Sequence, residues 1–275
     1  MKPVVAIVGL GQIGGSLAAA LTRRGLARVI GITRRPATAR RARRLGLLAD
    51  ASTNPEDAAG ADLVFLATPV RTLLRQVPDF ARIAGPESIL SDVGSTKAAV
   101  VRAFRTLPSP RPTLIAGHPM AGNERAGLDG VDPGLFHGRP WVLIPVRPAD
   151  RRRGALLERL IRGIGAKPHW MNSPEDHDYK VACVSHVPHL LAYALMGTPE
   201  AAVRVCGNSF RDATRVAASD VDMVLDFLLT NGSLPRASGD LIRRLKSLLG
   251  ALSRRDISAV RALLGRARSR RTKIV

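Results

Sequence analysis

The stretch "VVAIVGLGQIGGSLAAALTRRG", residues 4–25, determines the fold. Its first five residues are β-branched or small, and such a run is typical of a strand buried in a parallel sheet. Its last nine residues predict a helix that ends at a glycine. A glycine-rich turn separates the two. The order strand, glycine-rich turn, helix predicts the first unit of an α/β fold.

The glycines of this turn spell G-x-G-x-x-G. Gly9 would make the tight turn, Gly11 would let a pyrophosphate approach the backbone, and Gly14 would let the helix pack closely on the strand. Gln12 and Ile13 complete the loop at the helix N-terminus, where the helix dipole favours phosphate. We therefore expect these five residues to bind a dinucleotide; a glycine turn without a ligand is the alternative.

The residues after the second strand bear on which dinucleotide binds. An NAD site places an acidic residue about 20 residues beyond the glycines, where it accepts from the ribose 2′-hydroxyl. This chain has Thr33, Arg34 and Arg35 there. A hydroxyl and two guanidinium groups suit a 2′-phosphate. The sequence favours NADP, with NAD as the possible alternative.

Strands and helices alternate through the first part of the chain. Strands are expected within residues 4–8, 28–35, 61–70, 88–95, 113–119, 141–145 and 166–171, with helices within 96–104 and 153–165 among the intervening segments. This alternation predicts a Rossmann-type doubly wound parallel sheet. Thr68 and Pro69 follow the third of these strands and are expected to contact the cofactor.

The pattern becomes helical from residue 173, where Ser-Pro begins a segment with helical spacing. We therefore predict a dinucleotide-binding domain over residues 1–172 and an all-helical substrate-binding and dimerisation domain over residues 173–275. The segments "LLAYALM" and "MVLDFLLTNG" carry more apolar surface than a small helical unit can bury alone, which predicts a homodimer.

The charge of the chain is extreme, at +20 with arginine supplying 36 of the 42 basic residues. A basic chain can bind nucleic acid, but the arginines are dispersed and aromatic residues are only 4% of the total, so stacking platforms are scarce. The composition thus favours a small anionic substrate or cofactor over nucleic acid.

The remaining composition points to a cytoplasmic protein. Two cysteines, Cys183 and Cys206, form neither a disulfide framework nor a metal cluster. The first strand begins near Pro3, which leaves no room for a targeting peptide in this sequence, and no apolar run reaches the ~18 residues of a membrane span. We expect no membrane partner and no metal.

Four further motifs follow the glycine loop in order. They are "SDVGSTK" (91–97), "HPMAGNERAG" (118–127), "DHDYKVACVSHVPH" (176–189) and "GNSFRDATRVAASD" (207–220). With these motifs the sequence resembles the prephenate dehydrogenase family, including its arogenate-using relatives, from residue 4 to about residue 230. The resemblance implies oxidation of a ring hydroxyl by hydride transfer to a nicotinamide, followed by loss of CO2 and aromatisation to 4-hydroxyphenylpyruvate in tyrosine biosynthesis.

The resemblance also implies roles for individual residues. His118 would act as the base that hydrogen-bonds the 4-hydroxyl, and Ser95 would orient this histidine and the nicotinamide. Arg215 would bind a substrate carboxylate with His189 beside it. Glu124 would lie at the mouth of the pocket and pair with Arg215 when no substrate is bound.

The other histidines are less specific. His186 lies one helical turn before His189, so it either supports the substrate site or fills the domain interface. We expect His177, His169 and His137 to be surface or interface residues.

Several functions stay open at this point. Val221 and Val224 stand where many family members have Pro and a nearby Trp, so the substrate could be prephenate, arogenate or 4-amino-4-deoxyprephenate. Another NADP-dependent reductase with a helical second domain would leave "HPMAG" and "SHVPH" without a role. A non-catalytic NADP-binding sensor is the alternative from a different class.

Overall fold

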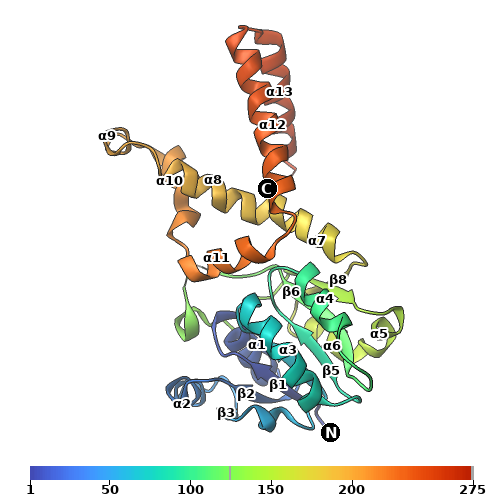
Figure 1. Ribbon diagram of the computed structural model, residues 1–275. Helices are drawn as coiled ribbons and strands as arrows, with labels where there is room; N and C mark the ends of the chain where they lie inside the picture. The colour runs from blue at the N-terminus through green and yellow to red at the C-terminus, as the bar shows by residue number, and fades with distance from the viewer. Residues whose placement is uncertain (124, 274–275) are drawn as a thin grey trace.

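The computed structural model describes residues 1–123 and 125–273, which form a sheet domain and a helical domain (Figure 1). The sheet has eight strands in the order β3-β2-β1-β4-β5-β6-β7-β8. The strands are β1 (Val4–Val8), β2 (Arg28–Ile32), β3 (Asp50–Ser52), β4 (Leu63–Leu66), β5 (Ile89–Asp92), β6 (Thr113–Pro119), β7 (Pro140–Pro145) and β8 (Lys167–Trp170). The sheet domain therefore has the Rossmann-type order expected from the glycine loop.

The sheet is mostly parallel, as expected, but its last two strands run in the opposite direction. The strands from β1 to β6 pair in parallel, but β7 runs antiparallel to β6 and β8 is parallel to β7. Between β6 and β7 the described residues contain only the short 3-10 helix η2 (Gly127–Gly130) and no crossover α-helix. A connection without a crossover joins adjacent strands in opposite directions, which explains the reversal.

Helices cover both faces of the sheet and bury a core on each. One core lies under α1 (Gln12–Arg23) and α6 (Ala155–Gly163), and the other lies under α3 (Val70–Ala84) and α4 (Ala98–Arg105). The remaining elements of this domain are α2 (Pro36–Arg44), η1 (Pro55–Ala58) and α5 (Pro148–Arg153). Burial on both faces explains why the central strands read as continuous apolar runs.

The helical domain begins after β8, so the predicted boundary at residue 173 falls between β8 and the next helix. Its elements are α7 (Pro174–Val181), the π-helical turn η3 (Ala182–His186), α8 (Val187–Leu195), α9 (Glu200–Val203), α10 (Asn208–Thr214), η4 (Arg215–Ala218), α11 (Val221–Thr230), α12 (Leu234–Ser253) and α13 (Ile257–Arg271). Helices α12 and α13 form a hairpin that projects away from the sheet (Figure 1). No helix in the described part of the chain is long and apolar enough to cross a membrane.

The two domains are joined through the N-terminus of α3. The carboxylate of Asp226, on α11, accepts from the backbone N–H of Val70 and from both the backbone N–H (3.1 Å) and the Nε–H (3.0 Å) of Arg71. Asp226 is only 6% exposed. A carboxylate at a helix N-terminus is favoured by the helix dipole and satisfies N–H groups that have no partner within the helix. Asp226 thus fixes α11 above the carboxyl end of β4.

We predict that Asp226→Ala destabilises the protein by about 2–3 kcal/mol, because buried N–H groups lose a charged acceptor. The urea midpoint of unfolding measures this change. Asp222→Ala is the matched control, since Asp222 is exposed on the same helix; it should change stability by less than about 0.5 kcal/mol. An Asp226→Ala midpoint equal to that of the control would show that this contact does not hold the domains together.

Candidate active site

The glycine loop has the geometry that a pyrophosphate requires. Gly9 has a φ of +102°, and a Cβ there would lie 2.7 Å from the carbonyl oxygen of Ala67. A Cβ on Gly14 would lie 1.9 Å from the carbonyl oxygen of Gly9, so α1 packs directly against the turn. A Cβ on Gly11 would meet nothing within 4 Å among the described residues. The open side of Gly11 is therefore where a ligand can approach the backbone.

The N-terminus of α1 is available to an anion. Gly11 is its N-cap, the first turn holds no acidic residue, and no described side chain caps it. The side chain of Gln12 bonds to the segment that follows His118. Its Nε2 donates to the carbonyl oxygens of Asn123 (3.0 Å) and Arg125 (2.7 Å). Ile13 is half-buried beside it. The residues present thus fit a dinucleotide whose phosphates lie at this helix terminus.

The other cofactor candidates lie along the same edge of the sheet. Thr33 follows β2 directly, and Arg34 and Arg35 after it are exposed. Thr68 and Pro69 follow β4; the Cγ2 of Thr68 would touch a Cβ on Gly9 at 3.0 Å. All five residues lie at the carboxyl ends of parallel strands, where such sheets bind ligands.

His118 stands at the carboxyl end of β6, on a backbone fixed by a buried ion pair. Lys97 and Asp92 are both fully buried and paired with each other. Asp92 Oδ1 accepts from the N–H of Gly117 at 3.0 Å, and Lys97 Nζ donates to the Gly117 carbonyl oxygen at 2.6 Å. Burial raises the pKa of the Asp92 carboxyl and lowers the pKa of the Lys97 ammonium, while each opposes the shift of its partner. Both polar groups of the Gly117 residue are thereby held.

The His118 ring belongs to a chain of buried polar groups. Its Nδ1 lies 3.0 Å from Nε2 of His177, and His177 Nδ1 lies 2.8 Å from Oδ1 of Asp178. The Asp178 carboxylate also accepts from the backbone N–H of Lys97 (2.6 Å) and of Ala98 (2.9 Å) at the start of α4. Burial, followed by the charges of His177 and Lys97, lowers the pKa of His118 well below its usual 6.5. His118 is therefore a neutral imidazole near pH 7.

The sequence-based expectation for His177 missed this role. It lies at the boundary between the domains, but it is 1% exposed and bonded directly to His118. Burial lowers its pKa, and the hydrogen bond to Asp178 opposes that shift. The signal that could have found it is the His-Asp pair that follows the helix start at Ser173 and Pro174, because a carboxylate beside a buried histidine orients the ring. His169 and His137 are exposed, as expected.

His186 and His189 lie on one face, as their spacing predicts. The His186 ring stacks on Phe227 with centroids 4.2 Å apart, and His189 meets the edge of the same ring at 5.2 Å. Asn231 Nδ2 lies 2.9 Å from His186 Nδ1, and burial lowers the pKa of His186 to about 4. His186 is thus held neutral inside the helical domain.

His189 is half-buried and lies just after the π-helical turn. Its Nδ1 donates to the carbonyl oxygen of Ser185 at 2.9 Å. Pro188 lacks a backbone N–H, and the Val187 N–H bonds to the Ala182 carbonyl oxygen in π-helical register. The π-turn therefore accommodates Pro188 and places His189 on α8.

The remaining candidates are placed less directly. Ser95 is half-buried on the loop between β5 and α4, and among the described residues no hydrogen bond joins it to His118. Arg215 is exposed at the start of η4, which packs against α8, the helix of His189. Glu124 lies outside the described residues. In the described part of the chain no group of three His, Cys, Asp or Glu residues is arranged to hold a metal ion.

Comparison with known proteins identifies the family. The family described as prephenate dehydrogenase, nucleotide-binding domain, matches residues 17–169, and the prephenate dehydrogenase dimerization domain matches residues 173–266. The chain belongs to the prephenate dehydrogenase family of oxidoreductases. The two matches cover most of the sheet domain and most of the helical domain, so the resemblance noted in the sequence is confirmed.

Two relatives of this prephenate dehydrogenase family member carry different names. Prephenate dehydrogenase of Bacillus subtilis is 35% identical over 84% of this chain, which spans 65% of that relative's length. Cyclohexadienyl dehydrogenase of Zymomonas mobilis is 33% identical over 92% of this chain and 89% of its own length.

Solved structures agree with this assignment. The prephenate dehydrogenase of A. aeolicus, in complex with hydroxyphenyl propionate and NAD+, has a TM-score of 0.92 at 30% identity over 100% of this chain and 99% of that chain. Synechocystis arogenate dehydrogenase has a TM-score of 0.87 at 29% identity over 99% of this chain and 100% of that chain. The fold of this chain is thus shared with both of these proteins, and the A. aeolicus structure holds NAD+.

Proposed function

We propose that this protein catalyses the NADP-dependent oxidative decarboxylation of prephenate to 4-hydroxyphenylpyruvate, with His118 as the base. The observation that carries the proposal is a buried imidazole at the carboxyl edge of the sheet, on a backbone held by Lys97 and Asp92, and burial lowers the pKa of this imidazole. Only histidine has an unperturbed pKa close enough to neutrality to accept a hydroxyl proton readily at pH 7.

The chemistry assigns one proton transfer to His118. The ring accepts the proton of the 4-hydroxyl, so electrons from the breaking O–H bond form the C4 carbonyl as hydride leaves C4. A bound nicotinamide supplies the hydride acceptor. The ring carboxylate then departs as CO2, its bonding electrons complete the aromatic ring, and the C4 carbonyl oxygen becomes a hydroxyl by taking back the proton that His118 accepted. The glycine loop would hold the cofactor at the same edge of the sheet as His118.

Further residues would hold the substrate in this proposal. Arg215 would bind a substrate carboxylate through its guanidinium fork, with His189 on the adjoining helix. Ser95 would orient the nicotinamide beside His118. Glu124 would lie at the mouth of the pocket. His186 would support His189 through their shared contact with Phe227.

The substrate is tested by direct assay. Purified protein with NADP is given prephenate, arogenate and 4-amino-4-deoxyprephenate in turn, and the reduced nicotinamide is followed by absorbance. We expect the highest kcat/KM with prephenate. A higher value with arogenate would assign the chain to the activity that names the Synechocystis relative. No turnover of any of the three would favour the NADP-binding sensor.

We predict that His118→Asn keeps the fold and NADP binding but loses roughly 10²–10⁴ in kcat, the usual share of a general base. Because burial lowers the pKa of His118 below 6.5, the wild-type kcat/KM should be level near pH 7 and fall only in more acidic buffer, as the ring protonates. His169→Asn, on the exposed surface, is the control. If the kcat of His118→Asn were within tenfold of the wild-type value, His118 would not be the base.

The cofactor preference is predicted from Thr33, Arg34 and Arg35. Charge-assisted hydrogen bonds to a 2′-phosphate are worth ~1.5–3 kcal/mol each, so kcat/KM with NADP should exceed that with NAD by about ten- to a hundredfold. Replacing Arg34 and Arg35 by Ala should reduce this ratio, whereas Arg23→Ala, on the far end of α1, should leave it unchanged. Equal or better kcat/KM with NAD in the wild type would contradict the proposal.

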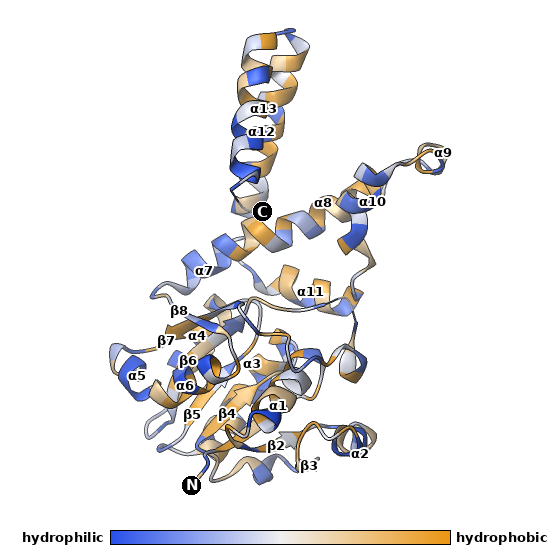
Figure 2. Cartoon of the chain, turned by 180° about the vertical axis from the view of Figure 1, so that it is seen from behind, coloured by the Kyte–Doolittle hydropathy of each residue, from blue (hydrophilic) through white to orange (hydrophobic). Residues whose placement is uncertain are grey.

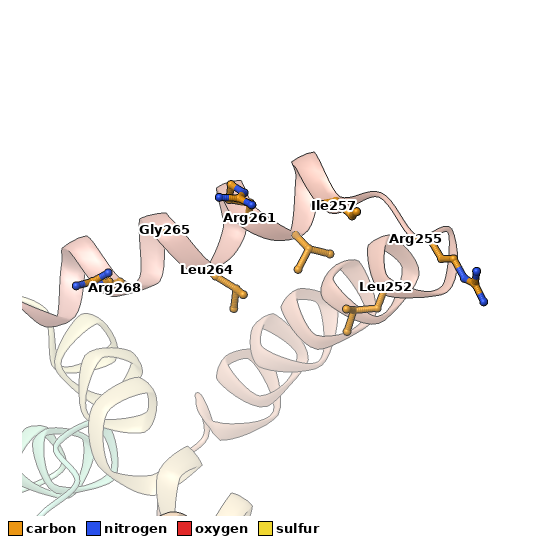
Figure 3. Close-up of a pocket in the computed structure, with 8 residues that line it drawn as sticks. Leu252, Arg255, Ile257, Arg261, Leu264, Gly265 and Arg268 are labelled. Atoms are coloured by element: carbon orange, nitrogen blue, oxygen red, sulfur yellow. The ribbon is translucent and has the colours of Figure 1, made fainter.

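We also propose a homodimer formed through the helical domain. The apolar core of this domain is small, whereas Leu249, Leu252 and Leu264 on the α12–α13 hairpin are 60%, 50% and 56% exposed. A groove of about 570 Å³ lies where the hairpin turns, with Leu252, Ile257 and Leu264 around it (Figure 3). Hydrophobic residues also run along α8 and α11 (Figure 2). A second copy would cover these faces, in keeping with the matched dimerization family.

The dimer is checked by light scattering at micromolar protein, where we expect twice the 29.4 kDa of one chain. Leu252→Glu should shift the equilibrium toward monomer, because it places a charge in an apolar contact. Leu45→Glu, equally exposed at 48% but on the sheet domain, should not. A monomeric wild type would refute the proposal.

A further inference from the structure

The hydrogen bonds around His118 have a fixed direction that begins at Asp178. Its Oδ1 accepts from the backbone N–H of Lys97, and its Oδ2 accepts from that of Ala98. Both donors belong to the N-terminus of α4, so the carboxylate faces N–H groups that cannot accept a proton. Asp178 is 1% exposed, and apart from His177 its carboxylate oxygens meet only these two N–H donors among the described residues. It therefore acts as an acceptor toward its third neighbour as well.

That third neighbour is His177. Its Nδ1 lies 2.8 Å from Asp178 Oδ1, so Nδ1 must carry the proton. Burial keeps the ring neutral, so its other nitrogen, Nε2, has a lone pair. Nε2 lies 3.0 Å from His118 Nδ1, and a neutral His177 can only accept there. His118 must then carry its own proton on Nδ1.

We propose that Asp178 and His177 are positioning residues that hold the His118 proton on Nδ1 and so direct the Nε2 lone pair of His118 to the substrate hydroxyl. This inference rests on the proposed role of His118 as the base and adds which nitrogen acts. With the opposite tautomer, Nε2 would bear a hydrogen and could not accept the hydroxyl proton.

The hydrogen bond to a neutral His177 would offset part of the cost of the charged form that His118 adopts during reaction. When Nε2 takes the hydroxyl proton, the ring becomes a cation in a site where burial opposes charge. The Nδ1–H bond to His177 then has a charged donor and strengthens. His177 is in turn polarised by the Asp178 carboxylate. An aspartate orients the general-base histidine of serine proteases by similar logic, with one imidazole fewer in the chain.

The arrangement depends on both domains. His118 lies on the sheet, whereas His177 and Asp178 lie on α7 of the helical domain. The rings of His118 and His177 meet edge to face, with centroids 5.2 Å apart and an interplanar angle of 72°. Because the Asp178 carboxylate caps α4, the tautomer of the base is tied to the docking of the two domains.

The tautomer can be measured without any turnover. Protein labelled with ¹⁵N in its six histidines gives long-range proton–nitrogen spectra that separate protonated from unprotonated ring nitrogens. His118→Asn and His177→Gln assign the two rings. At pH 7.5 we expect both His118 and His177 to be neutral and protonated on Nδ1. A His118 ring protonated on Nε2, or on both nitrogens, would overturn the inference whatever its activity.

Kinetics of two His177 variants provide a second readout. In His177→Gln the amide oxygen can take the place of Nε2 and accept from His118, while its NH2 donates to Asp178. His177→Phe offers no acceptor. We expect the Phe variant to lose about 10- to 100-fold in kcat with KM within twofold, the range seen when a residue that orients a metal-ligating histidine is removed. The Gln variant should recover most of kcat, and the exposed His169→Phe should match wild type.

These outcomes are separable from the proposed function. If His118→Asn stays active, the base is elsewhere and the proposed function fails, whereas the spectra still report the tautomer. If His118→Asn is inactive but folded His177→Phe has wild-type kcat, His118 is kept as the base and the positioning role of His177 is rejected. Equal losses in the Gln and Phe variants, with unchanged spectra for His118, would likewise reject it. The wild-type spectrum decides the matter even where His177→Phe does not fold.

Discussion

The carboxylate of Asp178 is the interaction on which the active site depends. It accepts from Lys97 and Ala98 at the start of α4, and from His177 on its own helix. Each of these donors would cost free energy if it were buried without a partner, about 1–3 kcal/mol for a neutral group. One side chain therefore satisfies the end of a sheet-domain helix and orients a histidine of the helical domain. The contact between His118 and His177 cannot form unless the domains are docked.

The same device appears at the neighbouring strand. Asp226 caps α3 as Asp178 caps α4, and both carboxylates come from the helical domain. Helix N-termini at the carboxyl edge of a parallel sheet are anion sites. In this structure two of them hold protein carboxylates, whereas the N-terminus of α1 has no capping side chain among the described residues. That uncapped N-terminus is the one preceded by the glycine loop, so in the proposed function domain docking and cofactor binding would use different helices.

Much of the sheet domain was predictable because its signals are local. The glycines of residues 9–14, the apolar strands and the position of His118 at a strand end are each encoded within a few neighbouring residues. The reversal of β7 was not predictable, since strand direction depends on the path of the connection and not on side-chain pattern. The three-residue β3 is too short and polar to give a strand signal. Periodicity indicated the helical domain as helices but not where its chain touches the sheet.

The role of His177 escaped prediction for a different reason. Its partner lies 59 residues away on another domain, and no spacing rule connects a helix start to a distant strand end. A histidine in a polar "DHDY" segment reads as exposed because its immediate neighbours are charged. The two aspartates beside His177 differ in burial. Asp176 pairs with Lys180 on the surface, whereas the side chain of Asp178 is buried.

The buried ion pair beside His118 positions the backbone of the site as well as contributing to the core. Removing the charges of Lys97 and Asp92 from water costs free energy that can exceed their mutual attraction. An apolar pair of similar size would often be as stable. What an apolar pair could not do is hold both the N–H and the carbonyl oxygen of Gly117. A Cβ at Gly117 would lie 2.4 Å from the Asp92 carbonyl oxygen, so only glycine permits this approach. The charges thus fix the backbone that aims His118, and the His177 contact fixes its ring.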